Sequence, residues 1–144
     1  MSDTMHECDS DILIARINKG EKVIESILNF CKNSGIEGAW ISGIGAFASA
    51  DLALYNLSKK EYTKKSLKGP FEICSLIGNV GIKDEKHIAH IHVVLSDDKM
   101  NAYGGHLNEA VVAATCELKV EIFDHPITRK HDEEIGLNLI EIGQ

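Results

Sequence analysis

The sequence has 144 residues, of which 44% are hydrophobic and 26% are charged, and its formal net charge is −7. This length is enough for one globular domain with its own core and too short for two ordinary domains. The negative charge argues against a protein whose main partner is the phosphate backbone of DNA, because such proteins present a basic surface.

The first twelve residues contain neither an apolar run nor a positively charged leader. We therefore expect no signal peptide, no transmembrane helix and a cytoplasmic location. None of the four cysteines forms a C-x-x-C pair, which favours reduced thiols over a zinc finger or a disulfide framework. Residues 1–9 are polar and acidic and are predicted to be flexible, and residues 10–144 are predicted to form a single domain.

A short strand is predicted over residues 11–17, with the sequence DILIARI, and a long N-terminal helix over residues 19–35. Apolar residues such as Val23 and Ile27 recur at helical spacing in the second segment. Gly35 closes the helix, because glycine readily takes the left-handed conformation at a helix end.

Beyond this helix the pattern changes to short apolar or alternating runs typical of strands. A polar turn is predicted over residues 96–101, a second short helix over residues 109–114, and a loop or one helical turn over residues 129–136. The predicted fold class is α+β, with a mainly antiparallel sheet and the two helices packed on it. The strands predicted in this part cover residues 39–47, 50–57, 61–67, 71–82, 87–96, 116–123 and 137–142.

Four of the seven histidines lie between residues 87 and 106, and His90 and His92 are separated by one residue. Side chains alternate between the two faces of a strand, so these two imidazoles point the same way, about 7 Å apart along the chain. His87 has the opposite parity and does not join them. His106 follows the polar turn, and a hairpin would return it beside the first strand.

Gly104 and Gly105 precede His106 and would let the backbone turn sharply and approach its neighbour closely. Three neutral imidazoles leave one position of a tetrahedral zinc ion open, as in catalytic zinc sites. Imidazole also binds other divalent transition metals. The alternatives are three polar residues without a metal, and a cupin-like site with Asp97 as its acidic residue, although the proline of the second cupin motif is missing.

Four further charged or aromatic residues are candidates for functional roles. Glu109 could act as a general base or hold a histidine N–H, and a carboxylate at a helix N-terminus explains it equally well. Tyr103 could line the site or pack against the sheet. Arg16 and Glu72 lie inside apolar strands, where they could form a polar pair near the metal or at a subunit interface, a buried ion pair, or two exposed side chains.

Four segments in order resemble those of a known family: residues 15–36 (ARINKGEKVIESILNFCKNSGI), 42–56 (SGIGAFASADLALYN), 69–80 (GPFEICSLIGNV) and 90–115 (HIHVVLSDDKMNAYGGHLNEAVVAAT). Together they are similar to the plant and prokaryote conserved (PPC) domain family in its stand-alone prokaryotic form. The resemblance extends over nearly the whole chain.

This resemblance implies an α+β domain that assembles as a homotrimer, with His90, His92 and His106 as ligands of a zinc ion. Plant members carry an AT-hook, a short basic segment that enters the DNA minor groove, and this sequence has none. Plant members also contact partner proteins through a strand that begins Gly-Arg-Phe-Glu-Ile-Leu. Here Pro70 and Cys74 replace the arginine and the leucine of that strand.

Two functions follow as hypotheses. The first is a trimeric binding or regulatory protein that carries zinc and has DNA or a protein as its partner, in line with the DNA-binding function attached to the family. The alternative is a zinc-dependent enzyme that acts on a small polar substrate at the open metal position. A purely structural metal is a third interpretation.

The lysine-rich run over residues 59–68 is either solvated surface or a small basic patch for an anionic partner.

Overall fold

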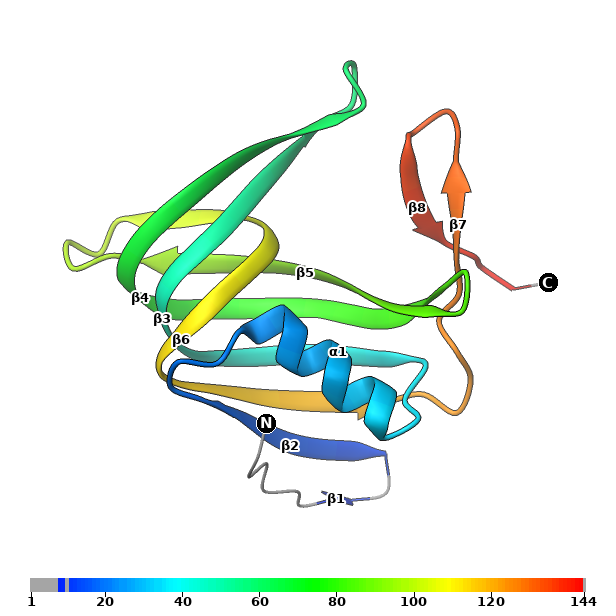
Figure 1. Ribbon diagram of the computed structural model, residues 1–144, viewed down its shortest axis with the longest axis horizontal. Coiled ribbons are helices and arrows are strands. Elements are labelled where there is room, and N and C mark those ends of the chain that lie inside the picture. The colour runs from blue at the N-terminus through cyan, green and yellow to red at the C-terminus, as the bar shows by residue number, and fades with distance from the viewer. Residues whose placement is uncertain (1–7, 10, 144) are drawn as a thin grey trace.

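The computed structural model describes residues 8–9 and 11–143, and this part of the chain forms eight strands and one helix (Figure 1). Residues 1–7, which fall in the segment predicted to be flexible, lie outside the described residues. The elements are β1 (Cys8–Asp9), β2 (Ile12–Asn18), α1 (Val23–Asn33), β3 (Ala39–Asn56), β4 (Glu61–Lys83), β5 (Lys86–Ser96), β6 (Ala102–Ile122), β7 (Arg129–Asp132) and β8 (Leu137–Ile140).

Six strands form one antiparallel sheet in the order β1-β2-β6-β3-β4-β5, and β7 and β8 form a separate hairpin. The beginning of β6 also pairs with β5, so β3, β4, β5 and β6 close into a ring. Register shifts between β3 and β4 interrupt their ladder, and such bulges bend strands. In Figure 1 the far ends of β3 and β4 rise from the sheet as a hairpin.

The core lies between α1 and one face of the sheet, which the helix crosses (Figure 1). Exposed and buried residues alternate along β2, and Leu13 and Ile17 are buried. The helix contributes Val23, Ile27 and Cys31, which recur every four residues along one side. Full burial of one aliphatic side chain of this kind stabilises the fold by roughly 1.5–3 kcal/mol. Burial of this stripe therefore holds the helix on the sheet.

The opposite face of the sheet has no helix over it among the described residues, and it is open except beside Asn79, which Arg129 of β7 covers. Cross-strand neighbours share a face, and Ile14, Lys119, Ser42, Ile77 and His92 form one continuous row across β2, β6, β3, β4 and β5. This face is rich in exposed apolar side chains: Ile12, Ile14, Trp40, Ile44, Ile77 and Val94.

The predicted fold class is wrong in its helical part, because the described chain is mostly antiparallel sheet with one short helix. α1 has 11 residues and begins later than predicted, after a turn in which Gly20 has a φ of +86°. Residues 109–114, predicted as a second helix, lie inside β6, where Ala110 pairs with Ala50 of β3. The segment has neighbours on the sheet, and this pairing overrides its local helix propensity.

β3 and β4 each join two strands that the sequence predicts as separate, and β6 begins earlier than predicted. β3 runs without a break through residues 48–49, and β4 through residues 68–70, because the register shifts between β3 and β4 absorb the irregular segments. Residues 129–136, predicted as a loop or a helical turn, contain β7. In the described part of the chain, no helix is long and apolar enough to cross a membrane.

Candidate metal centre

The three histidines come from two adjacent strands, His90 and His92 from β5 and His106 from β6. In β5, Ile91 and Val93 are buried in the core, so the two histidines that alternate with them project from the other face. β5 and β6 are antiparallel here, and His92 lies directly opposite His106 in the register. The hairpin therefore returns His106 beside the first strand, as the spacing predicts.

The turn that produces this return is made by a carboxylate and not by the glycine pair. Asp97 accepts the backbone N–H of Asn101 at 2.9 Å. Gly104 and Gly105 lie within β6, and neither has a positive φ. They permit close packing instead, because a Cβ atom on Gly105 would lie 2.9 Å from the carbonyl oxygen of Ala53 on β3. The absence of a side chain thus lets β6 approach β3 next to His106.

The imidazoles converge on one point. The Nε2 atoms of His90 and His92 are 3.1 Å apart. One ring nitrogen from each of the three histidines lies within 4.8 Å of the others, and no carboxylate or thiol of the described residues belongs to this group. Two nitrogens bound tetrahedrally to zinc at about 2.0–2.1 Å are about 3.3–3.4 Å apart. The separation of His90 and His92 is close to that value, so these residues could hold a metal ion.

The protonation of the site also suits a metal. Burial, followed by the neighbouring His92, Arg129 and His106, lowers the pKa of His90 to about 4. Burial and His92 lower the pKa of His106. Metals bind the neutral imidazole, so protons compete weakly for these two side chains at neutral pH. The Nδ1 atom of His106 is buried and has no hydrogen-bond partner in the described structure.

A cavity of about 280 Å³ opens beside the imidazoles. Tyr62 of β4 borders it, with its ring centroid 5.3 Å from that of His106. Arg129 of β7 also borders the cavity, and its guanidinium donates to Asn79 Oδ1 at 2.6 Å and to the carbonyl oxygen of Asn138 at 2.9 Å. His90, His106 and Asn138 also line the cavity, and the remaining lining residues are aliphatic: Ile88, Ala89, Leu137 and Leu139.

Glu109 does not belong to the histidine group, and it lies instead at the N-terminus of α1. Its Oε1 accepts the N–H of Ile24 at 2.8 Å, and its Oε2 accepts the N–H of Glu25 at 3.2 Å. The first N–H groups of a helix have no partner within the helix. Lys22, at the N-cap, makes no side-chain hydrogen bond there. The helix-terminal role considered for Glu109 belonged to a helix over residues 109–114; that segment is strand, and Glu109 contacts α1 instead.

The other candidate residues also lie apart from the imidazoles. Tyr103 donates its hydroxyl to Asp97 at 2.9 Å, and its ring meets Phe71 edge-on at a centroid distance of 6.2 Å. Arg16 and Glu72 are exposed on β2 and β4, and β6 and β3 lie between those strands. The structure therefore brings together the three histidines and places the four other candidates elsewhere.

Arg129 and Tyr62 border the cavity, although no sequence pattern draws attention to them. Arg129 reaches the histidines because the chain before β7 runs beside the end of β4, where Ile82 donates its N–H to the carbonyl oxygen of Ile127 at 2.7 Å. Tyr62 lies within the lysine-rich run, in which charge is the obvious feature. Both positions depend on tertiary packing, which local periodicity does not encode.

The fold and the site together define an antiparallel β domain that presents three convergent histidines on the face of its sheet opposite the helix. The chain belongs to the Plants and Prokaryotes Conserved domain family, whose model matches residues 7–124. The resemblance carried by the sequence motifs is thereby confirmed. The match ends before β7, so Arg129 lies outside the matched residues. No curated protein matches this chain.

Several solved structures match almost the whole chain, among them the following three. A metal-containing protein from Archaeoglobus fulgidus is 39% identical with a TM-score of 0.85, and the match covers 99% of this chain and 100% of that one. A plant- and prokaryote-conserved protein from Pyrococcus horikoshii is 36% identical with a TM-score of 0.85, covering 100% and 99%. A Bacteroides thetaiotaomicron protein, provisionally named as DNA-binding, is 28% identical with a TM-score of 0.91, covering 96% of each chain.

Proposed function

We propose that this protein binds zinc through His90, His92 and His106 and keeps one coordination position for a water molecule or a ligand. The observation that carries this proposal is the convergence of three ring nitrogens within 4.8 Å. The description of the Archaeoglobus fulgidus relative as metal-containing supports it. When bound, the ion would act as a Lewis acid toward whatever occupies the open position.

Metal analysis of the purified protein tests this function. We expect about one zinc ion per chain, and a loss of at least tenfold in zinc affinity for His92→Ala and for His106→Ala, because each loses one of only three ligands. His125→Ala is the matched control, since His125 is exposed and stacks on Phe123, outside the histidine group. Wild-type protein that takes up no zinc from solution would contradict the proposal.

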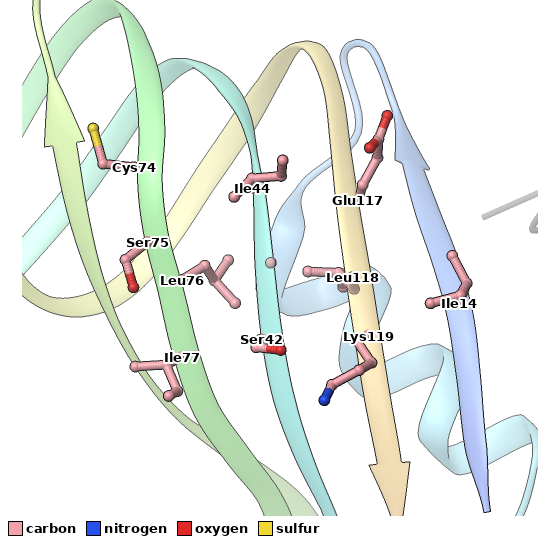
Figure 2. Close-up of a pocket in the computed structure, with 11 residues that line it drawn as sticks. Ile14, Ser42, Ile44, Cys74, Ser75, Leu76, Ile77, Glu117, Leu118 and Lys119 are labelled. Atoms are coloured by element: carbon pink, nitrogen blue, oxygen red, sulfur yellow. The ribbon is translucent and has the colours of Figure 1, made fainter.

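We also propose that the chain assembles as a homotrimer through the open face of its sheet, in line with the family resemblance. Ile14, Ile44 and Ile77 on this face are 51%, 59% and 47% exposed in the single chain. They lie on β2, β3 and β4 (Figure 2), and they line a hollow of about 450 Å³. Exposed apolar patches of this kind mark sites of contact with other molecules.

Light scattering coupled to size-exclusion chromatography tests the assembly. The wild type should elute with the mass of three chains. Ile44→Lys should shift the mass toward one chain, because a charge would be buried at the contact. Met100→Lys is the control, since Met100 is 80% exposed in the turn between β5 and β6 and lies off the open face. A monomeric wild type at micromolar concentration would refute this part of the proposal.

DNA is one of the two kinds of partner that the first hypothesis considers, and the Bacteroides relative is provisionally named as DNA-binding. Exposed lysines between residues 59 and 68 lie on the β3–β4 hairpin and are the candidate DNA contact. They form a local positive patch, although the net charge of the whole chain is −7. Fluorescence anisotropy with a labelled duplex should show binding that weakens with added salt and falls in a Lys64→Gln/Lys65→Gln variant. No binding at low salt would remove DNA as a direct partner.

An enzyme that acts on a small polar substrate is the second candidate function. The cavity of about 280 Å³ beside the histidines favours it, because Tyr62 and Arg129 offer hydrogen-bond donors there. Nuclear magnetic resonance of small carbonyl and carboxylate compounds, incubated with zinc-loaded protein, should reveal turnover that His92→Ala lacks. Identical spectra for the two proteins across such a panel would argue against catalysis.

A further inference from the structure

The cavity beside the histidines carries positive charge and has no acidic side chain among its lining residues. Arg129 remains charged at any ordinary pH. A divalent ion at the histidines would add two positive charges. The chain as a whole is acidic, with a net charge of −7, so the lack of a carboxylate in this wall is a local feature. An uncompensated charge in a partly enclosed site is unfavourable, and a bound anion would neutralise it.

Arg129 is held in place without being neutralised. Its two hydrogen bonds go to the side-chain oxygen of Asn79, which is only 4% exposed, and to the backbone carbonyl of Asn138. Both acceptors are uncharged. No ion pair joins Arg129 to a carboxylate among the described residues, and its Nε atom is buried without a partner there. A guanidinium has five N–H donors, so donors remain for a ligand.

The wall that contains Arg129 is fixed to the rest of the site. Tyr55 on β3 donates its hydroxyl to the carbonyl oxygen of Ile135 at 2.7 Å, and Lys60 donates to the carbonyl oxygen of Glu133 at 2.5 Å. These bonds join the β3–β4 hairpin to the segment between β7 and β8. Because the two hairpins support each other, the cavity exists before a ligand arrives, and less ordering is needed on binding.

We propose that this cavity binds a small carboxylate with a short apolar tail, held jointly by the Arg129 guanidinium and the zinc ion, an inference that rests on the proposed zinc site. The planar fork of arginine matches the two oxygens of a carboxylate. The aliphatic part of the wall, from β5 and β8, would accept the tail. Ligand cavities usually measure about 300–1,000 Å³, so a cavity of about 280 Å³ suits a ligand of few atoms.

Isothermal titration calorimetry of the zinc-loaded protein with butyrate tests this inference. The wild type should bind butyrate and should bind the neutral isostere butyramide at least about tenfold more weakly, because the amide lacks the charge. Arg129→Gln should weaken butyrate binding at least about tenfold and leave zinc content unchanged. Lys130→Gln is the matched control: it removes the same charge from the exposed neighbouring position of β7 and should leave butyrate affinity unchanged.

The outcomes separate this inference from the zinc proposal. If the wild type holds zinc and Arg129→Gln binds butyrate as tightly as the wild type, Arg129 is not the anion site and the inference fails. Equal affinity for butyrate and butyramide also overturns it. If the protein takes up no zinc, the proposal that zinc and Arg129 hold the carboxylate together fails along with the zinc proposal. A loss of butyrate binding in Arg129→Gln would then still show that Arg129 binds the anion.

A second variant keeps the test decisive if Arg129→Gln does not fold. Leu139 lines the cavity and is 39% exposed on β8, so it can be changed without opening the core. Leu139→Glu would bring a carboxylate to the wall and repel the ligand, whereas Leu139→Gln has nearly the same shape and no charge. We expect butyrate binding to weaken at least about tenfold more in the glutamate variant than in the glutamine variant. Equal affinities in the two variants would contradict the inference.

Discussion

Replacement of Glu109 by alanine should destabilise the protein without removing its metal. Glu109 is on β6, and its carboxylate accepts the N–H groups of Ile24 and Glu25 at the beginning of α1, at 2.8 and 3.2 Å. The helix has no side-chain cap of its own at Lys22. A strand therefore caps the helix that packs on it, and the contact links α1 to the sheet.

The expected loss follows from these two contacts. A hydrogen bond to a charged group contributes about 1.5–3 kcal/mol, so the contact with Ile24 sets the loss, and the exposed Glu25 contact adds little because water can replace it. We expect Glu109→Ala to lower the free energy of unfolding by about 2 kcal/mol, which corresponds to a fall of about 4–8 °C in Tm. Glu109→Gln keeps an acceptor oxygen but loses the charge at the helix N-terminus, so its loss should be about 0.3–1 kcal/mol.

Urea unfolding followed by circular dichroism, with all proteins at one chain concentration, measures these losses, because oligomer stability depends on concentration. Zinc content measured on the same samples separates a capping role from a catalytic or ligating one. Stability of Glu109→Ala equal to that of the wild type would refute the capping argument. Loss of zinc with unchanged stability would instead place Glu109 at the metal centre.

Two further predictions concern the strands around the histidines. Gly78→Ala should lower both Tm and zinc affinity, because the new Cβ would lie 2.1 Å from the carbonyl oxygen of His90 and must displace β5; a variant with wild-type zinc affinity would contradict this. At Asp97, burial raises the pKa, but hydrogen bonds from Asn101, Tyr103 and Lys99 outweigh it and lower the pKa to about 2 from 3.8. The stability gained from this carboxylate is present above pH 3.8 and disappears as the pH falls to about 2. Chemical unfolding should therefore show the free energies of unfolding of the wild type and Asp97→Asn converging over that range. A difference between the two proteins that stays constant with pH would refute the assignment.

The histidine group illustrates what could be read from local patterns. Strand alternation predicts that His90 and His92 share a face and that His87 does not, and in the structure both project opposite the buried Ile91. The polar segment predicts the turn that returns His106. Helical spacing predicts α1, although its length was overestimated. Each of these features depends on residues within one segment, whose periodicity is visible without knowledge of the fold.

Other features depend on partners far away in the chain. Residues 109–114 have good helix propensity and form strand, because β3 pairs with residues 109–112 of β6. Glu109 itself was a candidate general base. In the structure its carboxylate accepts the N–H of Ile24, which lies 85 residues earlier in the chain at the N-terminus of α1. No local signal distinguishes these outcomes.

Spacing within single segments and motifs in order were enough to predict the strand-rich character of the chain, the common face of His90 and His92, and the family to which the chain belongs. The positions of Arg129 and Tyr62 beside the histidines became visible in the folded structure. Their positions follow from the contact between two hairpins and from the closure of β5 onto β6. Such contacts join residues that are far apart in the sequence. They form, and stabilise the protein, only when the chain is folded, so no local pattern predicts them.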